Sequence, residues 1–458
     1  MEGPFVVVGG DAAGMSAASK TKRDAPDPEV VVFERGEWVS YAACGLPYYV
    51  KGEVESLDDL VTVTPEAFRE ERGIDLRTNH EVVAVDPEAK TVTVEGPEGR
   101  FEQPYGTLLL ATGAHAVEPP IDGMDLEGVF TLHSLPAARA VREYLGFDAS
   151  GPADAEPAVD RAAVVGGGYV GIEMAEAFAE HGLEVDLFEM LPHVLQPFGE
   201  RVAERVEDHL REQGVRLHLD TPVEAFLGES RLEAIRTPDG DVPVDVAMVG
   251  VGVAPNADLA EEAGIELGET GAVATDEYGR TNYDDVFAAG DCAEARHVVT
   301  GDPDHVPLAL TANRAGRAIG RTVAGDPTPT GEIAGTAVLK AFDLEVARTG
   351  VIDQGRAREA GFDPVSVFID AESRAHYYPG GSPIGIGMVA DRGTGRLLGA
   401  SMVGREGVAK RIDTVATALH AGMTLAEVET LDLSYAPPFS PVWDPVLTAA
   451  KVLRGKLD

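Results

Sequence analysis

The sequence predicts an α/β chain with two doubly wound, Rossmann-like domains and a C-terminal α+β domain. A strand, a glycine-rich turn, a helix and a second strand follow one another from PFVVVGG to EVVVFERG, and the same order recurs at residues 161–190. From about residue 331, apolar and polar residues alternate in segments such as TAVLKAFDLEVARTG, and a segment with helical periodicity follows. We therefore expect parallel sheets first and a mostly antiparallel sheet last.

The composition indicates a globular protein with an acidic surface. The 458 residues can form more than one core, and the hydrophobic fraction of 44% is typical of globular proteins. The net charge of −41 is spread along the chain. It favours a solvated surface of the kind found in a high-salt cytoplasm, or a surface that recruits a basic partner. Nucleic-acid binding is disfavoured because it needs clustered lysine and arginine.

Several expected absences follow from the sequence. It contains no run of 18 apolar residues, and MEGPFVVVGG lacks a basic leader, so we expect a cytoplasmic protein with no membrane segment. Two cysteines are too few for a disulfide scaffold or for the usual cysteine-based zinc site. No metal site is expected.

The glycine-rich turn of the second unit has the spacing G-x-G-x-x-G, and Glu189 ends the strand that follows. This pattern brings backbone amides at a helix N-terminus close to a pyrophosphate. A carboxylate at Glu189 can accept hydrogen bonds from ribose hydroxyls and would repel a 2′-phosphate, which favours NADH over NADPH, although His193 and Arg201 could still bind a phosphate. The predicted NAD(P)H contacts are Gly166, Gly167, Gly168, Tyr169, Val170, Gly171, Glu189 and Gly252.

The glycine-rich turn of the first unit is degenerate, because Asp11 occupies the place of the middle glycine. The matching acidic residue is Glu34. Two further segments support a second dinucleotide site: LLLATGA at 108–114 and TNYDDVFAAGDCAE at 281–294.

With these four motifs in this order, the chain resembles the FAD-dependent pyridine nucleotide-disulfide oxidoreductase family along essentially its whole length. The resemblance implies that the first turn binds FAD, that the Ala-Thr-Gly segment connects two domains, and that Gly290 and Asp291 approach the flavin's ribityl chain. VGVAPN, at 251–256, matches the segment where the chain re-enters the FAD domain. The implied FAD contacts are Gly9, Gly10, Asp11, Ala12, Ala13, Gly14, Glu34, Arg35, Ala111, Thr112, Gly113, Gly290 and Asp291.

The resemblance also implies the division into domains. An FAD-binding domain would comprise 1–115 and 250–330, an NAD(P)H-binding domain 116–249, and a dimerisation domain 331–458. We therefore expect a homodimer that binds FAD and NAD(P)H.

Cys44 lies in SYAACGLPYY without a second cysteine nearby, since Val39 and Tyr49 occupy the positions five residues away. A single thiol beside a flavin can form a mixed disulfide with a substrate thiol, and a helix beginning near Gly45 would lower its pKa. The alternative is a small buried hydrophobic residue. Cys292, in GDCAE, is expected to be buried and structural.

Within the family, SYAACGLPYY and YAPPFSPVWDP (435–445) are similar to coenzyme A disulfide reductases. The resemblance implies that the partner subunit presents Tyr435 and Tyr377, or Tyr378 in another register, as proton donors. Packing at a dimer interface is the alternative role for these tyrosines. Relatives that reduce peroxide or oxygen carry a histidine at the position of Ala12, which favours a disulfide substrate here.

The resemblance also implies substrate contacts. Lys20, Arg23 and Arg72 are expected partners for the phosphates of a nucleotide-bearing thiol. Ala43 replaces an asparagine that is frequent in coenzyme A disulfide reductases, and Trp443 replaces a lysine of some relatives, so the identity of the thiol stays open. The expected substrate contacts are Ser16, Lys20, Arg23, Ser40, Ala43, Arg72, Asn313 and Trp443.

The predicted function is reduction of coenzyme A disulfide, or a similar small disulfide, by NAD(P)H through FAD and Cys44, in cellular redox homeostasis. An NAD(P)H-dependent polysulfide or persulfide reductase and an NADH oxidase are alternatives on the same scaffold. A third alternative is an electron-transfer reductase for a ferredoxin-like protein, in which Cys44 is incidental.

Overall fold

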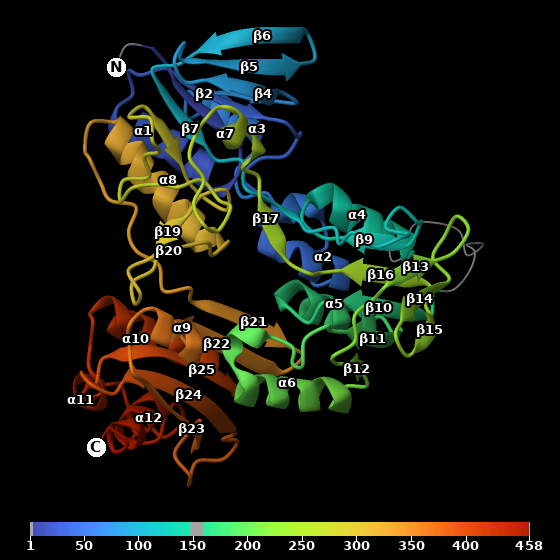
Figure 1. Cartoon of the computed structure of the whole chain (residues 1–458), viewed down its shortest axis with the longest axis vertical. Coiled ribbons are helices and arrows are strands. Elements are labelled where there is room, and N and C mark those ends of the chain that lie inside the picture. The colour runs from blue at the N-terminus through green and yellow to red at the C-terminus, as the bar shows by residue number, and fades with distance from the viewer. Residues whose placement is uncertain (1–2, 147–158, 458) are drawn as a thin grey trace.

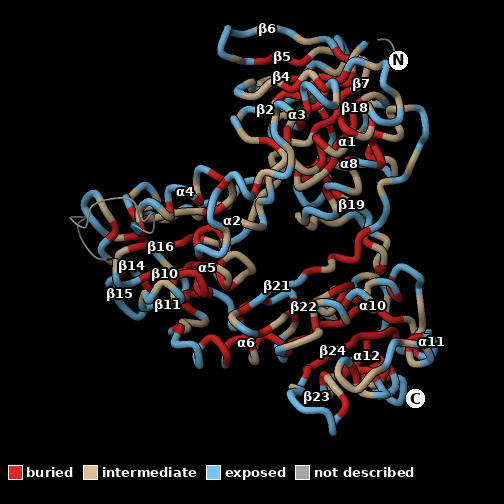
Figure 2. The backbone as a smooth tube through the Cα atoms, turned by 180° about the vertical axis from the view of Figure 1, so that it is seen from behind, coloured by how far each residue is buried: buried red, intermediate tan, exposed pale blue. Residues whose placement is uncertain are grey.

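The structure, a computed structural model, describes residues 3–146 and 159–457 and consists of three bodies (Figure 1). The first body is built from both the N-terminal segment and a later segment of the chain, so blue and yellow elements lie together in it. The second body contains the teal and green elements, and the third the orange and red ones. Figure 2 shows that buried residues are concentrated inside each body.

The first body contains a parallel sheet in the order β18-β7-β1-β2-β3. Its strands are short apolar runs buried on both faces, as expected for a covered parallel sheet. Helices α1 and α8 pack on one face, and the antiparallel sheet β4-β5-β6 and helix α7 cover the other. The bounds are β1 Phe5–Val8, α1 Ala12–Asp24, β2 Val30–Glu34, α3 Pro65–Glu70, β3 Asp75–Thr78, β4 Glu81–Asp86, β5 Thr91–Gly96, β6 Gly99–Pro104, β7 Thr107–Leu110, α7 Asp258–Glu262, β18 Val286–Ala288, β19 Ala295–Arg296, β20 Pro303–Asp304 and α8 Ala309–Val323.

The second body repeats this design with a parallel sheet in the order β12-β11-β10-β16-β9. The two connections between the bodies, β8 and β17, lie side by side as an antiparallel pair. The bounds are β8 Ala114–Ala116, β9 Val129–Thr131, α4 Leu135–Tyr144, β10 Arg161–Val165, α5 Tyr169–Glu180, β11 Glu184–Phe188, α6 Glu200–Glu212, β12 Arg216–His218, β13 Ala225–Leu227, β14 Ala234–Thr237, β15 Gly240–Pro243, β16 Val246–Val249 and β17 Val253–Pro255.

The third body is an antiparallel sheet in the order β21-β22-β25-β24-β23. Helices α10 and α12 pack on one face, and α6 of the second body contacts β22, β24 and β25. The predicted fold class, two Rossmann-like units and an α+β unit, is confirmed. The bounds are β21 Ala337–Ala341, β22 Leu344–Gly350, α9 Gln354–Glu359, β23 Pro364–Glu372, β24 Pro383–Asp391, β25 Leu397–Gly404, α10 Val408–His420, α11 Leu425–Glu429 and α12 Pro445–Arg454.

Helices α1 and α8 approach each other closely because glycines line their contact. A Cβ atom at Gly316 of α8 would overlap the backbone carbonyl of Ala13, and one at Gly320 would meet the carbonyl of Ala17. This close packing places the first turn of α1 beside α8, where both helices contribute to the site described below.

We predict that Gly316→Ala destabilises the first body. Alanine would favour the helix by about 1 kcal/mol, but its methyl group would force the two backbones apart, at a cost of about 1–3 kcal/mol. Calorimetric unfolding measures the change. Gly355→Ala is the control, because a Cβ there meets only the Asp353 side chain and backbone packing is not disturbed. An unchanged unfolding temperature for Gly316→Ala would contradict the close approach.

Candidate active site

The first glycine-rich turn joins β1 to α1. A Cβ at Gly9, where φ is +110°, would overlap the Ala111 carbonyl, and a Cβ at Gly14 would overlap the Gly9 carbonyl. The carboxylate of Glu34 accepts hydrogen bonds from the amides of Gly10 (2.8 Å) and Gly36 (2.7 Å). Backbone crowding therefore requires glycine where the motif has its first and last glycines, and the turn fits a dinucleotide.

Asp11 does not prevent this turn from accepting a pyrophosphate. Its carboxylate accepts a hydrogen bond from the Tyr41 amide (3.1 Å) instead of capping α1. Burial, together with the Glu34 and Asp291 carboxylates, raises the pKa of Asp11 to about 7 against the lowering effect of the Tyr41 amide. The first turn of α1 carries no acidic side chain. An anionic pyrophosphate is therefore compatible with Asp11 in the place of the middle glycine.

Two predicted segments meet where the chain crosses between the first two bodies. The Thr112 hydroxyl donates to the Asn256 carbonyl (2.7 Å), and the Asn256 amide donates to the Thr112 carbonyl (2.8 Å). Gly290 and Asp291 follow β18. This strand pairs with β7, which ends just before the Ala-Thr-Gly segment. Burial raises the pKa of Asp291.

The second glycine-rich turn repeats the first. A Cβ at Gly171 would overlap the Gly166 carbonyl, and Glu189, the residue after β11, accepts hydrogen bonds from the amides of Gly167 (2.7 Å) and Leu191 (2.9 Å). The N-terminus of α5 begins at Gly168 without a side-chain cap. This turn also fits a dinucleotide, with its helix N-terminus available to the phosphates. Gly252, with φ +115°, precedes β17, and the Tyr169 hydroxyl accepts a hydrogen bond from Arg348 (3.2 Å).

His193 and Arg201 are already paired. The His193 ring lies 3.0 Å from a carboxylate oxygen of Glu207, and Arg201 lies 3.3 Å from Glu204. These pairs reduce the positive charge that either side chain offers to a 2′-phosphate.

Cys44 lies in a 3-10 turn (Ala43–Gly45) that leads into α2, Leu46–Lys51. It is exposed, whereas Cys292 is completely buried and its thiol contacts the carbonyls of Leu110 and Ala289. A helix does begin after Gly45, but the expected lowering of the Cys44 pKa is wrong. Although the residue is exposed at one side, the atoms packed around its thiol remove part of its hydration and raise the Cys44 pKa first, followed by the carboxylates of Glu173, Asp291 and Asp11.

A tyrosine of the segment that follows Cys44 pairs with a glutamate of α5. The Tyr48 hydroxyl, one turn after Cys44, donates to Glu173 of α5 (3.0 Å). Burial, with a smaller contribution from the Glu176 carboxylate, raises the pKa of Glu173 to about 7 against the lowering effect of the Tyr48 hydrogen bond. The sequence did not single out this pair.

A cationic cavity of about 280 Å³ lies next to the turn that precedes Cys44. Four cations line it, with Lys20 and Arg23 on α1, Arg72 after α3, and Arg317 on α8. The Ser16 hydroxyl donates to Asn313 (2.6 Å), Arg72 donates to Ser19 (2.9 Å), and the Arg72 guanidinium packs 4.7 Å from the centre of the Phe68 ring. The full lining is Asp11, Ala12, Met15, Ser16, Ser19, Lys20, Arg23, Ser40, Phe68, Arg72, Asn313 and Arg317.

Six of the eight expected substrate contacts line this cavity, and two do not. Ala43 lies in the turn beside Cys44, and Trp443 lies in the third body, where Lys451 packs 5.0 Å from its ring. Arg317 was missed, although it follows Asn313 by four residues and therefore lies on the same face of a helix.

The two tyrosines of the third body meet. Their hydroxyls are 3.0 Å apart, and this hydrogen bond raises the pKa of Tyr435. Tyr378 instead packs 6.0 Å from Arg374. Tyr377 and Tyr435 are both exposed, together with Phe439, Val442 and Trp443. The loop after β23 that carries Tyr377 lies at the far edge of the third body, away from α2 (Figure 1).

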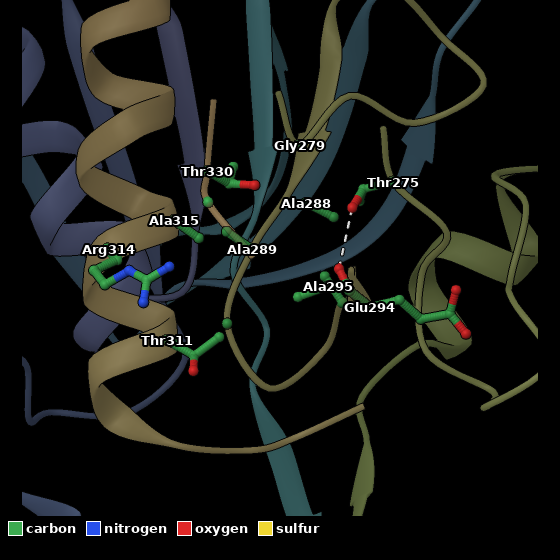
Figure 3. A pocket seen from close by; sticks show the side chains of 13 residues that line it. Thr275, Gly279, Ala288, Ala289, Glu294, Ala295, Thr311, Arg314, Ala315 and Thr330 are labelled. Atoms are coloured by element: carbon green, nitrogen blue, oxygen red, sulfur yellow. Dashed lines mark hydrogen bonds between the residues drawn. The ribbon is translucent and has the colours of Figure 1, made fainter. Parts of the chain in front are cut away.

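A second hollow, of about 20 Å³, lies between α8 and the loop after β18 (Figure 3). It is lined mainly by alanine, glycine and threonine, with Arg314 of α8 at one side, and has room for about one water molecule. Of the predicted site residues it contains only Gly290. Beside it, the Thr275 hydroxyl donates a hydrogen bond to the Glu294 carbonyl (3.1 Å).

Two further observations concern the described ranges, 3–146 and 159–457. They contain no helix long and apolar enough to cross a bilayer. Within the same ranges, histidine, cysteine and acidic side chains form no group that could hold a metal ion.

The chain is similar to characterised proteins over its length. The model for "Pyridine nucleotide-disulphide oxidoreductase" matches residues 3–316, and that for the family's dimerisation domain matches residues 336–445. The chain is 42% identical to the NAD(P)H coenzyme A polysulfide/persulfide reductase of Pyrococcus horikoshii over 99% of both chains. It is 30% identical to a coenzyme A disulfide reductase of Staphylococcus aureus, over 95% of this chain and 96% of the relative.

Among solved structures, the NAD-dependent persulfide reductase from A. fulgidus superimposes with a TM-score of 0.93 at 39% identity, covering 99% of this chain and 83% of the other. Both glycine-rich turns therefore stand in a fold whose relatives use FAD and NAD(P)H. The chain belongs to the pyridine nucleotide-disulphide oxidoreductase family and is an NAD(P)H-dependent FAD oxidoreductase.

Proposed function

We propose that this protein is a homodimeric reductase of coenzyme A disulfide, and that Cys44 is its redox-active thiol. The observation that carries the proposal is the cationic cavity lined by Ser40, four residues before Cys44. Although the chain has a net charge of −41, four cationic side chains line this one cavity. Asp11 and Ser40 line it as well. Coenzyme A is a thiol with three phosphate groups, so its charge matches this cavity and its sulfur would extend towards Cys44.

The proposed reaction at Cys44 is thiol–disulfide exchange. The Cys44 thiolate attacks one sulfur of the substrate disulfide, a sulfur–sulfur bond to Cys44 forms, the substrate's own sulfur–sulfur bond breaks, and one coenzyme A thiolate leaves. FAD, when bound and reduced by NAD(P)H, supplies the electron pair that releases the second thiol. The single cysteine is sufficient because the substrate provides the other sulfur.

Tyr435 and Tyr377 are the proposed proton donors to the departing thiolates. Their hydroxyls form a pair on an exposed surface of the third body, while Cys44 lies by α2, which contacts the second body. The dimerisation domain offers the route by which a partner subunit could bring such a pair to the site. Phe439, Val442 and Trp443 supply exposed apolar surface for that contact.

Reduction of a coenzyme A persulfide or polysulfide is a second candidate. The relative named for this activity has a higher identity, 42%, than the disulfide reductase, at 30%. In addition, Ala43 stands where coenzyme A disulfide reductases often carry asparagine. The same cationic cavity would hold the nucleotide in either reaction, so relative rates with coenzyme A disulfide, coenzyme A persulfide and oxygen distinguish the candidates.

We predict that Cys44→Ser lowers disulfide reductase activity by about 10³-fold or more, because the variant lacks the sulfur that forms the mixed disulfide. NAD(P)H oxidation with coenzyme A disulfide measures it. Cys292→Ser is the control, since Cys292 is completely buried. Retention of full activity by Cys44→Ser would favour the electron-transfer alternative and refute the proposal.

We predict that Arg317→Ala raises KM for coenzyme A disulfide about tenfold while kcat changes little, because a charge-assisted hydrogen bond to phosphate is lost. Pantethine, a related disulfide without phosphates, should show no such change. Arg321→Ala on the same helix is the matched control, because Arg321 pairs with Asp326 instead of lining the cavity. An equal effect of Arg317→Ala on both disulfides would mean that the cavity does not bind phosphate.

We propose that NADH is preferred, because Glu189 would face a 2′-phosphate with a negative charge. Glu189→Ala should raise KM for NADH about 10- to 100-fold and bring it closer to that for NADPH. Steady-state kinetics with each coenzyme measure the ratio. Glu184→Ala, at the exposed start of the strand that precedes Glu189, should leave the ratio unchanged. An unaltered ratio in Glu189→Ala would contradict this role.

A further inference from the structure

The tyrosine pair of the third body is carried by two loops that come from different parts of the chain. Tyr377 lies in the loop between β23 and β24, whereas Tyr435 lies in the segment between α11 and α12. Their hydroxyls are 3.0 Å apart, although both side chains are exposed. Exposed side chains gain entropy by moving apart, so this pair requires its two backbones to be held at a fixed separation.

Arg411, near the start of α10, joins the backbones of these two loops. Its Nη2 group donates to the carbonyl of Ser373 at 3.0 Å and to the carbonyl of Phe439 at 2.9 Å. Ser373 precedes Tyr377 by four residues, and Phe439 follows Tyr435 by four residues. One guanidinium nitrogen therefore bridges the two loops that carry the hydroxyl pair.

The other two nitrogens of this guanidinium are anchored as well. Nε donates to Asp444 at 2.8 Å, and Nη1 donates to the Gly407 carbonyl at 3.1 Å. The second carboxylate oxygen of Asp444 accepts the Val446 amide at 2.9 Å and so caps α12. The side chains of Arg411 and Asp444 are only 12% and 10% exposed. Because the guanidinium is planar and rigid, these anchors set the direction of the donors that bridge the loops.

Further contacts hold the start of the β23–β24 loop. Glu406, after β25, accepts hydrogen bonds from the Ser373 hydroxyl and from Arg374. The Ala375 amide donates to the Pro437 carbonyl of the other loop at 3.2 Å. The loop is thus anchored before it reaches the tyrosine, and its separation from the other loop depends on the bridging contacts.

We propose that Arg411 is a positioning residue, which sets the separation of the Tyr377 and Tyr435 hydroxyls by bridging the loops that carry them. It acts on the tyrosines through the backbone. The kinetic consequence rests on the proposed function, because the geometry of the hydroxyls affects the rate only if they give protons to departing thiolates. The geometry itself can be measured without any disulfide.

The first experiment follows the ionisation of Tyr435 by fluorine NMR in the FAD-containing protein, with a ring-fluorinated tyrosine at that position in every variant. The hydrogen bond with Tyr377 holds the pKa of Tyr435 above its ordinary value. In Arg411→Gln the loops lose their bridge, so the titration midpoint should fall by about half a pH unit or more. Tyr377→Phe gives the midpoint of a broken pair. A wild-type midpoint in Arg411→Gln would overturn the proposal.

The second experiment measures kcat with coenzyme A disulfide. Arg411→Gln should lower kcat about tenfold and leave KM almost unchanged, because the tyrosines are misplaced while the cationic cavity is intact. In a background of Tyr377→Phe and Tyr435→Phe, the same substitution should lower kcat by less than about twofold, since a misplaced donor and a missing donor have the same consequence. An equal reduction in both backgrounds would indicate general damage and overturn the proposal.

The two proposals can fail separately. If Tyr377→Phe with Tyr435→Phe leaves kcat unchanged, the proton-donor part of the proposed function is refuted. The Tyr435 midpoint then still decides whether Arg411 sets the geometry of the pair, because that measurement involves no substrate.

Two further variants separate the bridge from the stability of the third body. Arg411→Lys keeps the charge opposite Asp444, but a single amine does not reproduce the fork that bridges the carbonyls. Its midpoint and kcat should lie between those of the wild type and Arg411→Gln. Val415→Ala, one turn further along α10 in the apolar core, should lower the unfolding temperature and change neither value. If Arg411→Gln does not fold, a wild-type midpoint in Arg411→Lys overturns the proposal, as does an equal shift in Val415→Ala.

Discussion

A buried ion pair links the segment that follows Cys44 to the second body, and its carboxylate also contacts the third body. Lys51, at the end of α2, lies 2.6 Å from Glu176 of α5, and both side chains are about 95% buried. The other oxygen of Glu176 accepts a hydrogen bond from the Phe342 amide of the third body (2.7 Å). Removing one partner of such a buried pair costs about 3–5 kcal/mol because the other charge loses its compensation. The position of the Cys44 segment therefore depends on contacts from two other bodies.

This arrangement separates the charges around the proposed reaction. Cations line the cavity between α1, α8 and the loop of Arg72, whereas the carboxylates that act on the Cys44 thiol raise its pKa. The cavity would attract an anionic substrate at its nucleotide end. The substrate's sulfur would meet the Cys44 thiol, whose raised pKa disfavours the thiolate. Binding energy from the remote phosphates can in this way offset an unfavourable step at the reacting sulfur.

The sequence predicted features that depend on local backbone geometry. Gly9, Gly14, Gly166 and Gly171 follow a spacing that backbone crowding imposes, so both turns could be located without a structure. The fold class followed from the same repeats. The contact between Tyr48 and Glu173 joins residues 125 positions apart in different bodies, and no local pattern marks it. The direction of the Cys44 pKa shift was mispredicted because it depends first on burial and then on carboxylates from distant segments, neither of which a local pattern shows.

The paired carboxylates at the two glycine-rich turns have a consequence for how readily coenzyme preference could change. Glu34 and Glu189 each tie down two backbone amides, so each turn has its shape before any dinucleotide arrives, and little conformational entropy is lost on binding. At the second turn, the proposed recognition of the coenzyme's ribose and the shape of the glycine-rich loop thus depend on the same side chain, Glu189. A substitution that admits a different coenzyme at Glu189 also releases the loop that binds it, and needs a compensating change elsewhere.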